Sequence, residues 1–109
     1  MKEPPLLKRL ESTAREYVDA AAREERASNR NARKHTRETA DEWRSALTLA
    51  NARRRDVAKA LVCIAGDERS AAAAIRGADK VESWREGGAK YALDLMKRVE
   101  EEKKRRRRW

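Results

Sequence analysis

Two short runs of basic side chains are the groups in this chain best suited to chemistry, and that chemistry is the binding of anions. Residues 26–37 contain five cations and no acidic residue, and residues 103–108 are six consecutive cations. The formal net charge is +9, so the rest of the chain, with 17 basic and 19 acidic residues, sums to −2. Like charges held together repel one another unless an anion neutralises them. The separation of charge therefore predicts two anion-binding clusters on a near-neutral protein.

The internal cluster is the run without acidic neighbours, and it consists of Arg26, Arg30, Arg33, Lys34 and Arg37. If the segment is helical, its four arginines follow a 4-3-4 spacing and form one basic stripe. Asn29, Asn31 and His35 lie among them, and such side chains can hydrogen-bond to phosphates or base edges. The alternative is an exposed segment whose arginines serve solubility. We predict that this cluster contacts phosphate groups.

The C-terminal cluster consists of Lys103, Lys104, Arg105, Arg106, Arg107 and Arg108. It can clamp phosphates, because each neutralised phosphate releases counterions. The alternative is a solvated helix end, since residues 100–102 are glutamates spaced four residues before basic partners, the favourable order for helical ion pairs. Trp109 could stack on a base. We predict anion binding here too, with part of the charge explained by helical pairing.

Evidence for catalysis is thin. Cys63 and His35 are each the only residue of their kind, and together they could form a nucleophile–base pair. Cys63 is flanked by Val62 and Ile64, however, so we expect it to be a small buried core residue. One His and one Cys are too few for an ordinary zinc site, and residues 87–88 match no phosphate-binding glycine loop. We therefore expect no enzyme, no cofactor and no metal.

The composition predicts helices that present these clusters. Strong helix formers dominate, and residues 6–65 contain neither glycine nor proline. Leu, Ile, Val and Phe together number only 15, and 20 residues are alanine, so each helix can bury only a thin apolar stripe. Such a chain is marginally stable alone, and we expect a homo-oligomer.

A heptad stripe is the strongest structural signal. Its 4-3 spacing is unbroken from Thr36 and Ala40 through Trp43, Leu47, Ala50, Arg54, Val57, Leu61 and Ile64. This pattern predicts a helix packed along its length against another helix, with Trp43 to Ile64 as the packing or partner surface. Arg54 alone breaks the stripe, so we expect it to pair with a carboxylate on a facing helix. Thr39 and Glu42 have capping-box spacing, and Thr36 would start the helix one turn earlier.

The expected fold is all-α, with long helices near residues 6–27, 36–65 and 79–106 and a short helix near 68–76. They would form a single domain, residues 1–109, as an antiparallel bundle or a coiled-coil hairpin, with 100–109 a charged helix end or tail. Gly66 and Asp67 read as a stop and a fresh cap. The alternatives for residues 28–36, a turn or a continuous helix, stay open.

The last third of the chain carries further signals. We expect the short helix to end at Gly77, and Asp79 with Glu82 repeats the capping-box spacing. The pair Gly87-Gly88 can kink the last helix or let a neighbour approach closely. Residues 70–88 resemble a phage-repressor helix-turn-helix, but the two residues that separate Arg76 from Asp79 are too few for its turn. No family is assigned.

We expect a non-catalytic protein that holds the backbone of DNA or RNA through both clusters, with little sequence specificity. The competing class is an adaptor or inhibitor, typical of phages and mobile elements, whose heptad stripe binds an acidic partner protein. A variant is an oligomer that holds a small nucleotide-like anion. With no signal peptide, no membrane-spanning run and a single cysteine, we expect a cytoplasmic, reducing location and no membrane partner.

Overall fold

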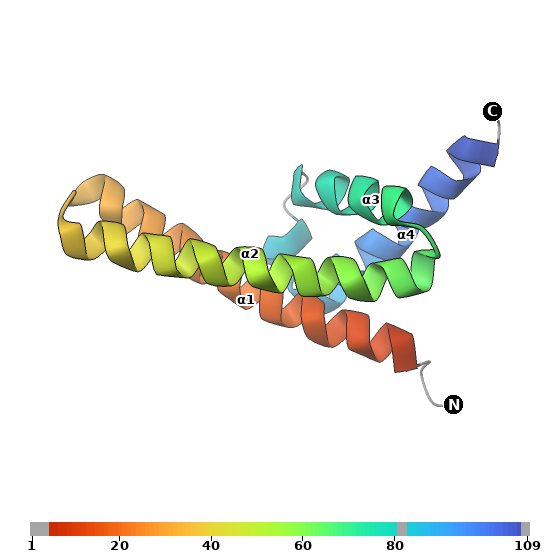
Figure 1. Cartoon of the computed structure of the whole chain (residues 1–109), viewed down its shortest axis with the longest axis horizontal. Helices are drawn as coiled ribbons and strands as arrows, with labels where there is room; N and C mark the ends of the chain where they lie inside the picture. The colour runs from red at the N-terminus through yellow and green to blue at the C-terminus, as the bar shows by residue number, and fades with distance from the viewer. Residues whose placement is uncertain (1–4, 81–82, 108–109) are drawn as a thin grey trace.

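The computed structural model describes residues 5–80 and 83–107, and this part of the chain is all-α. It contains four α-helices and a short 3-10 helix: α1 (Pro5–Arg33), α2 (Arg37–Ala65), α3 (Glu68–Lys80), η1 (Ser83–Glu86) and α4 (Gly88–Arg107). The helices α1 and α2 form a long antiparallel hairpin, and α3 and α4 pack against its open end (Figure 1). The expected all-α class is confirmed.

The junction between α2 and α3 agrees with the sequence prediction. Gly66 adopts the left-handed conformation, with φ at 80°, and its N–H donates to the carbonyl of Val62 at 2.8 Å. The side chain of Asp67 then accepts a hydrogen bond from the backbone N–H of Ser70 at 2.6 Å. The predicted stop at Gly66 and the fresh cap at Asp67 are both confirmed.

The predicted boundary at Gly77 is wrong. α3 continues to Lys80, so the short helix does not end at 76, and residues 77–78 are helical rather than a turn of the helix-turn-helix kind. A glycine inside a helix costs about 1 kcal/mol relative to alanine, and a close neighbour can make it the residue that fits. Here Arg98 of α4 fills the space, because its Nη1 lies 2.8 Å from the place where a Cβ on Gly77 would be.

The last long helix begins at Gly88 rather than near 79. Asp79 lies inside α3 and therefore starts no helix, and Glu82, its predicted capping partner, lies outside the described residues. The break comes at Gly87, whose φ of 121° is readily adopted only by glycine. Gly88 then lets two backbones meet, since a Cβ there would lie 2.5 Å from the Cα of Arg15 in α1. The predicted close approach at this glycine pair is confirmed.

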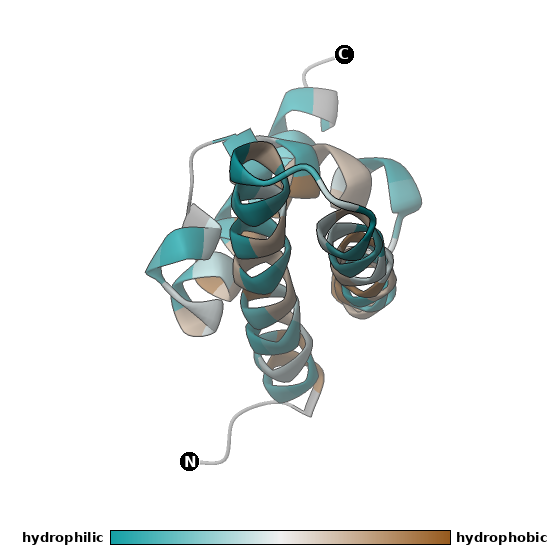
Figure 2. Cartoon of the chain, turned by 90° about the vertical axis from the view of Figure 1, so that its left-hand side faces the viewer, coloured by the Kyte–Doolittle hydropathy of each residue, from teal (hydrophilic) through white to brown (hydrophobic). Residues whose placement is uncertain are grey.

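The hairpin has two parts that differ in their packing, which we call the head and the arm. The head is the end of the hairpin covered by α3, η1 and α4, and its core contains large buried side chains: Leu10, Val57, Leu61, Ile75, Tyr91, Leu95 and Val99. The arm comprises residues 24–48, where α1 and α2 pack mainly against each other, and its buried apolar residues are Ala27 and Ala46. At the base of the arm, Arg85 of η1 pairs with Glu25 at 2.7 Å. Viewed from the tip of the arm, hydrophilic residues line much of the outer surface of the hairpin (Figure 2).

The heptad stripe is buried in the head and only partly buried in the arm. Val57 and Leu61 are fully buried, Ala50 is buried, and Ile64 packs at the edge of the core. Trp43 is half-buried in the arm. Leu47 is 39% exposed, so the expected packing is wrong there. Around Leu47 the described helix that packs against α2 is α1, and the neighbouring Ala46 takes the buried position instead.

Candidate nucleic-acid interface

The internal cluster lies at the tip of the arm. α1 continues through Arg33, and Lys34, His35 and Thr36 form the connection to α2, so both alternatives for residues 28–36 are partly right. Thr36 is the N-cap of α2: its Oγ1 accepts from the backbone N–H of Thr39 at 3.2 Å, and its own N–H donates to Thr39 Oγ1 at 3.0 Å. The capping box therefore uses residues 36 and 39 rather than 39 and 42, and it fixes the turn.

The cations of the internal cluster are all exposed. Arg30 forms an ion pair with Glu42 of α2, an acidic partner that only the hairpin brings near. The other four side chains have no ion-pair or hydrogen-bond partner among the described residues: Arg26, Arg33, Lys34 and Arg37. Unpaired cations on a projecting surface are available to an external anion.

The surface at the tip is shallow and polar. Arg26, Asn29, Arg30 and Arg33 line a depression of about 250 Å³ on α1. Asn31, which the sequence offered as a hydrogen-bonding group for a ligand, is instead turned inward and accepts a hydrogen bond from Thr39 at 3.1 Å. The tip therefore presents guanidinium and ammonium groups suited to phosphates, with fewer side chains free to contact base edges.

The C-terminal cluster lies at the end of α4. Lys104, Arg105 and Arg107 are exposed and Lys103 is half-buried, whereas the side chain of Arg106 and all of Arg108 and Trp109 lie outside the described residues. Arg105 pairs with Glu102 at 3.9 Å, three residues away, rather than with the glutamate four residues before it. A long pair with a largely exposed arginine stabilises little and leaves the arginine free to turn to another anion.

The structure does not bring the two clusters together. They lie at opposite ends of the molecule, whose longest dimension is 50 Å (Figure 1). The two clusters therefore form two separate basic surfaces rather than one continuous patch.

A partly buried polar network holds the head in register and so fixes the direction of the arm. It takes one residue from each α-helix, since Arg54, Tyr17 and Tyr91 all bind the carboxylate of Asp79. Arg54 Nε donates to Asp79 Oδ2 at 3.0 Å, while the Tyr91 and Tyr17 hydroxyls donate to Oδ1 at 2.8 and 3.4 Å. The prediction that Arg54 pairs with a carboxylate on a facing helix is confirmed. A satisfied, partly buried network of this kind favours one arrangement of the helices.

The network also shifts the ionisation of its tyrosines. Burial, together with the negative charge of Asp79, raises the pKa of Tyr17 to about 12. The same causes raise the pKa of Tyr91 well above its ordinary value. The two rings lie 5.6 Å apart, centroid to centroid. Neutral phenols that donate to one carboxylate serve a structural role. The sequence did not reveal that Asp79 would be the acceptor of these two hydrogen bonds.

The structure separates the two residues that could have formed a catalytic pair. His35 lies in the turn at the tip and Cys63 near the other end of α2, so the stretch of α2 from Arg37 to Cys63, about 39 Å of helix, lies between them. Cys63 is exposed, which corrects the expectation that it is a core residue. Within residues 5–80 and 83–107, no three His, Cys, Asp or Glu side chains gather as metal ligands. No helix of this part combines the length and apolar character needed to cross a bilayer.

Comparison of the chain with protein-family models, with curated proteins and with solved structures found no match.

Proposed function

We propose that the protein binds the phosphate backbone of nucleic acids, DNA or RNA, through the internal cluster at the tip of the arm. The observation that carries this proposal is the set of four exposed, unpaired cations there, Arg26, Arg33, Lys34 and Arg37. Each phosphate that such a group neutralises releases condensed counterions, which favours binding. The arm carries the cluster away from the head, so a nucleic acid can approach the tip from several sides (Figure 1).

The expected mode is contact with the backbone and little reading of sequence. The cluster is built from long, solvated side chains on a shallow surface, and Asn31 is engaged within the hairpin. Phosphate contacts position a protein without distinguishing base pairs. The C-terminal cluster supplies a second contact at the opposite end of the molecule, to another segment of the same nucleic acid or to a second one.

The test is the salt dependence of binding. Arg26→Gln/Arg33→Gln/Lys34→Gln removes three charges, keeps good helix formers and breaks no ion pair among the described residues. Each lost phosphate contact lowers the slope of log affinity against log salt by about 0.9, so the slope should fall by about two to three for duplex DNA. Fluorescence anisotropy over a series of salt concentrations measures it.

The matched control removes three exposed cations of the head that have no ion pair within residues 5–80 and 83–107, as Lys8→Gln/Arg9→Gln/Lys97→Gln. The control should keep most of the slope. If both triple variants lose the same slope, net charge alone drives binding and the tip is not the interface. If the unmodified protein shows no steep salt dependence with DNA or RNA, the proposed function is wrong.

A partner protein is the second candidate, and one observation favours it. An apolar groove of about 560 Å³ runs between α2 and α3, lined in part by Ala58, Val62 and Ala71 with Arg55 and Lys59 at its rim. An acidic amphipathic helix would fit this chemistry, and it could come from another protein. Binding to a partner that survives nuclease treatment and the triple variant at the tip, but not Val62→Glu, would favour this candidate.

A further inference from the structure

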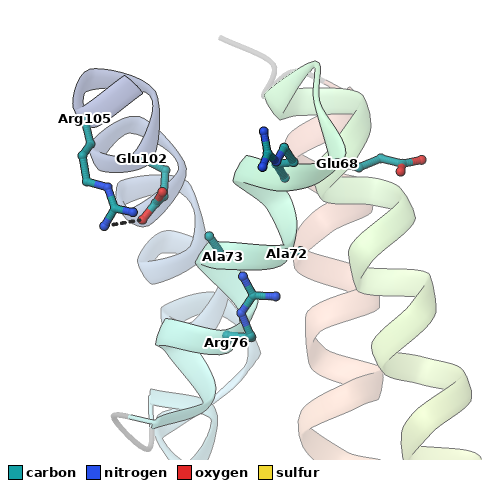
Figure 3. Close-up of a pocket in the computed structure, with 7 residues that line it drawn as sticks. Glu68, Ala72, Ala73, Arg76, Glu102 and Arg105 are labelled. Carbon is teal, nitrogen blue, oxygen red and sulfur yellow. Dashed lines mark ion pairs between the residues drawn. The ribbon is translucent and has the colours of Figure 1, made fainter. Parts of the chain in front are cut away.

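A cleft of about 620 Å³ lies between α3 and the last turns of α4 (Figure 3). Its volume falls within the range of pockets that hold small ligands. The α3 side of the cleft includes the small residues Ala72 and Ala73, and three arginines surround it: Arg69 and Arg76 from α3 and Arg105 from α4. Arg69 and Arg76 belong to neither basic run of the sequence.

The two α3 arginines are free to bind a ligand. Arg69 and Arg76 are exposed, and neither has an ion-pair or hydrogen-bond partner among the residues that the structure describes. They are seven residues apart, which places them two turns apart on one face of α3, with a rise of about 10 Å between them. The planar guanidinium fork matches phosphate oxygens, so such a pair suits a ligand that carries more than one phosphate.

The acidic residues near the cleft oppose this use only weakly. Glu68 extends away from α4 (Figure 3) and also borders the groove between α2 and α3. Glu102 is paired with Arg105 at 3.9 Å, but the Arg105 side chain is 74% exposed, so the pair is worth little. An incoming phosphate can recruit Arg105 at small cost.

We propose that this cleft binds phosphate groups, with Arg69 and Arg76 as the main ligands and Arg105 closing over them from α4. The phosphates belong either to the polyphosphate chain of a small molecule or to a nucleic-acid backbone. The site lies in the head, at the other end of the molecule from the tip of the arm (Figure 1). Phosphate binding in this cleft therefore does not depend on whether the tip of the arm binds nucleic acid.

The test uses the full chain, with tripolyphosphate and a short DNA duplex as the two probes, measured by isothermal titration calorimetry and anisotropy. Arg69→Gln/Arg76→Gln should weaken binding of at least one probe about tenfold or more, because two charge-assisted contacts are lost. A second variant, Ala73→Glu, places a carboxylate in the cleft and should weaken the same probe. The matched control is Lys8→Gln/Arg9→Gln, and circular dichroism checks that each variant folds.

The pattern of losses identifies the source of the phosphate. Loss of tripolyphosphate binding indicates a small polyphosphate ligand, and loss of duplex binding alone indicates a nucleic-acid backbone. Arg26→Gln/Arg33→Gln/Lys34→Gln at the tip should leave tripolyphosphate binding unchanged, which separates this site from the proposed function. The proposal is overturned if the unmodified protein binds neither probe, or if the cleft variants and the control weaken binding equally.

Discussion

The arm and the head are built on the same two helices but are held together in different ways. The head has large buried side chains and a four-helix polar network, whereas the arm buries two alanines. The arm relies instead on polar contacts, in which Trp43 Nε1 donates to Glu24 at 2.7 Å and Arg30 pairs with Glu42. Apolar burial scales with area, so the head supplies most of the free energy of folding. The arm can therefore carry unpaired charge without a cost to the core.

The largest expected contrast comes from one substitution made in each part of α2. Leu61 is fully buried in the head and Leu47 is 39% exposed in the arm, 14 residues earlier. Leu61→Ala should lower the free energy of unfolding by about 2–5 kcal/mol, since it removes buried apolar area and leaves a cavity. Leu47→Ala should cost less than about 1 kcal/mol. Urea unfolding followed by circular dichroism measures both changes. Equal losses in the free energy of unfolding would show that the arm is part of the same hydrophobic core as the head.

Alkaline pH should also act on the head. Below pH 10 the tyrosines of the network are neutral in both the folded and the unfolded chain, and their contribution is complete. Above pH 10 the unfolded chain releases phenolic protons that the folded chain retains, because burial raises the pKa of Tyr17 to about 12. Stability should therefore fall from pH 10 to pH 12, by on the order of 3 kcal/mol for Tyr17.

The control for this effect is Tyr17→Phe/Tyr91→Phe. This double variant starts less stable, because Asp79 loses two hydrogen-bond donors. Its free energy of unfolding should then fall much less between pH 10 and pH 12. An unchanged alkaline loss in the double variant would mean that other groups cause it.

Glycine substitutions test how closely the helices of the head approach. Gly88→Ala should destabilise by about 1–3 kcal/mol, because the new Cβ would meet the backbone of Arg15 at 2.5 Å. Gly77→Ala is the matched control, since its Cβ would meet the mobile end of Arg98 and alanine favours a helix. In thermal unfolding, the midpoint temperature of Gly88→Ala should lie well below that of Gly77→Ala. The reverse order would contradict the close packing of α4 on α1.

Local signals predicted much of the fold. The bounds of α2, the stop at Gly66 and the need of Arg54 for a carboxylate all follow from propensities, caps and spacing. The end of α3 does not, because a glycine ends a helix or continues it depending on its neighbours. Gly77 continues α3 where Arg98 covers it, and that contact exists only after α4 has packed. Leu47 was misassigned for a similar reason, since a heptad stripe does not show how many helices face each of its turns.

The candidate sites, like the fold, were only partly predictable from the sequence. The charges of the internal cluster are evident from the sequence, but the partner of Arg30 follows only from the hairpin, which brings Glu42 beside it. Arg69 and Arg76 carry no signal of their own in a chain with 28 basic residues. They become a candidate site because α4 places Arg105 across a cleft from them.

The smallest expected effect is in the arm, where Trp43 donates its indole N–H to Glu24. Trp43→Phe keeps an aromatic ring but removes the hydrogen-bond donor, so it should lower the stability of the arm by about 1 kcal/mol. Because few apolar contacts tie the arm to the head, the loss should appear as faster local opening. Hydrogen exchange of the amides in residues 24–48 should accelerate, while those around Leu61 and Leu95 in the head should keep their protection. Equal acceleration in both parts would show that the chain unfolds as one cooperative unit, and that the arm is no softer than the head that carries it.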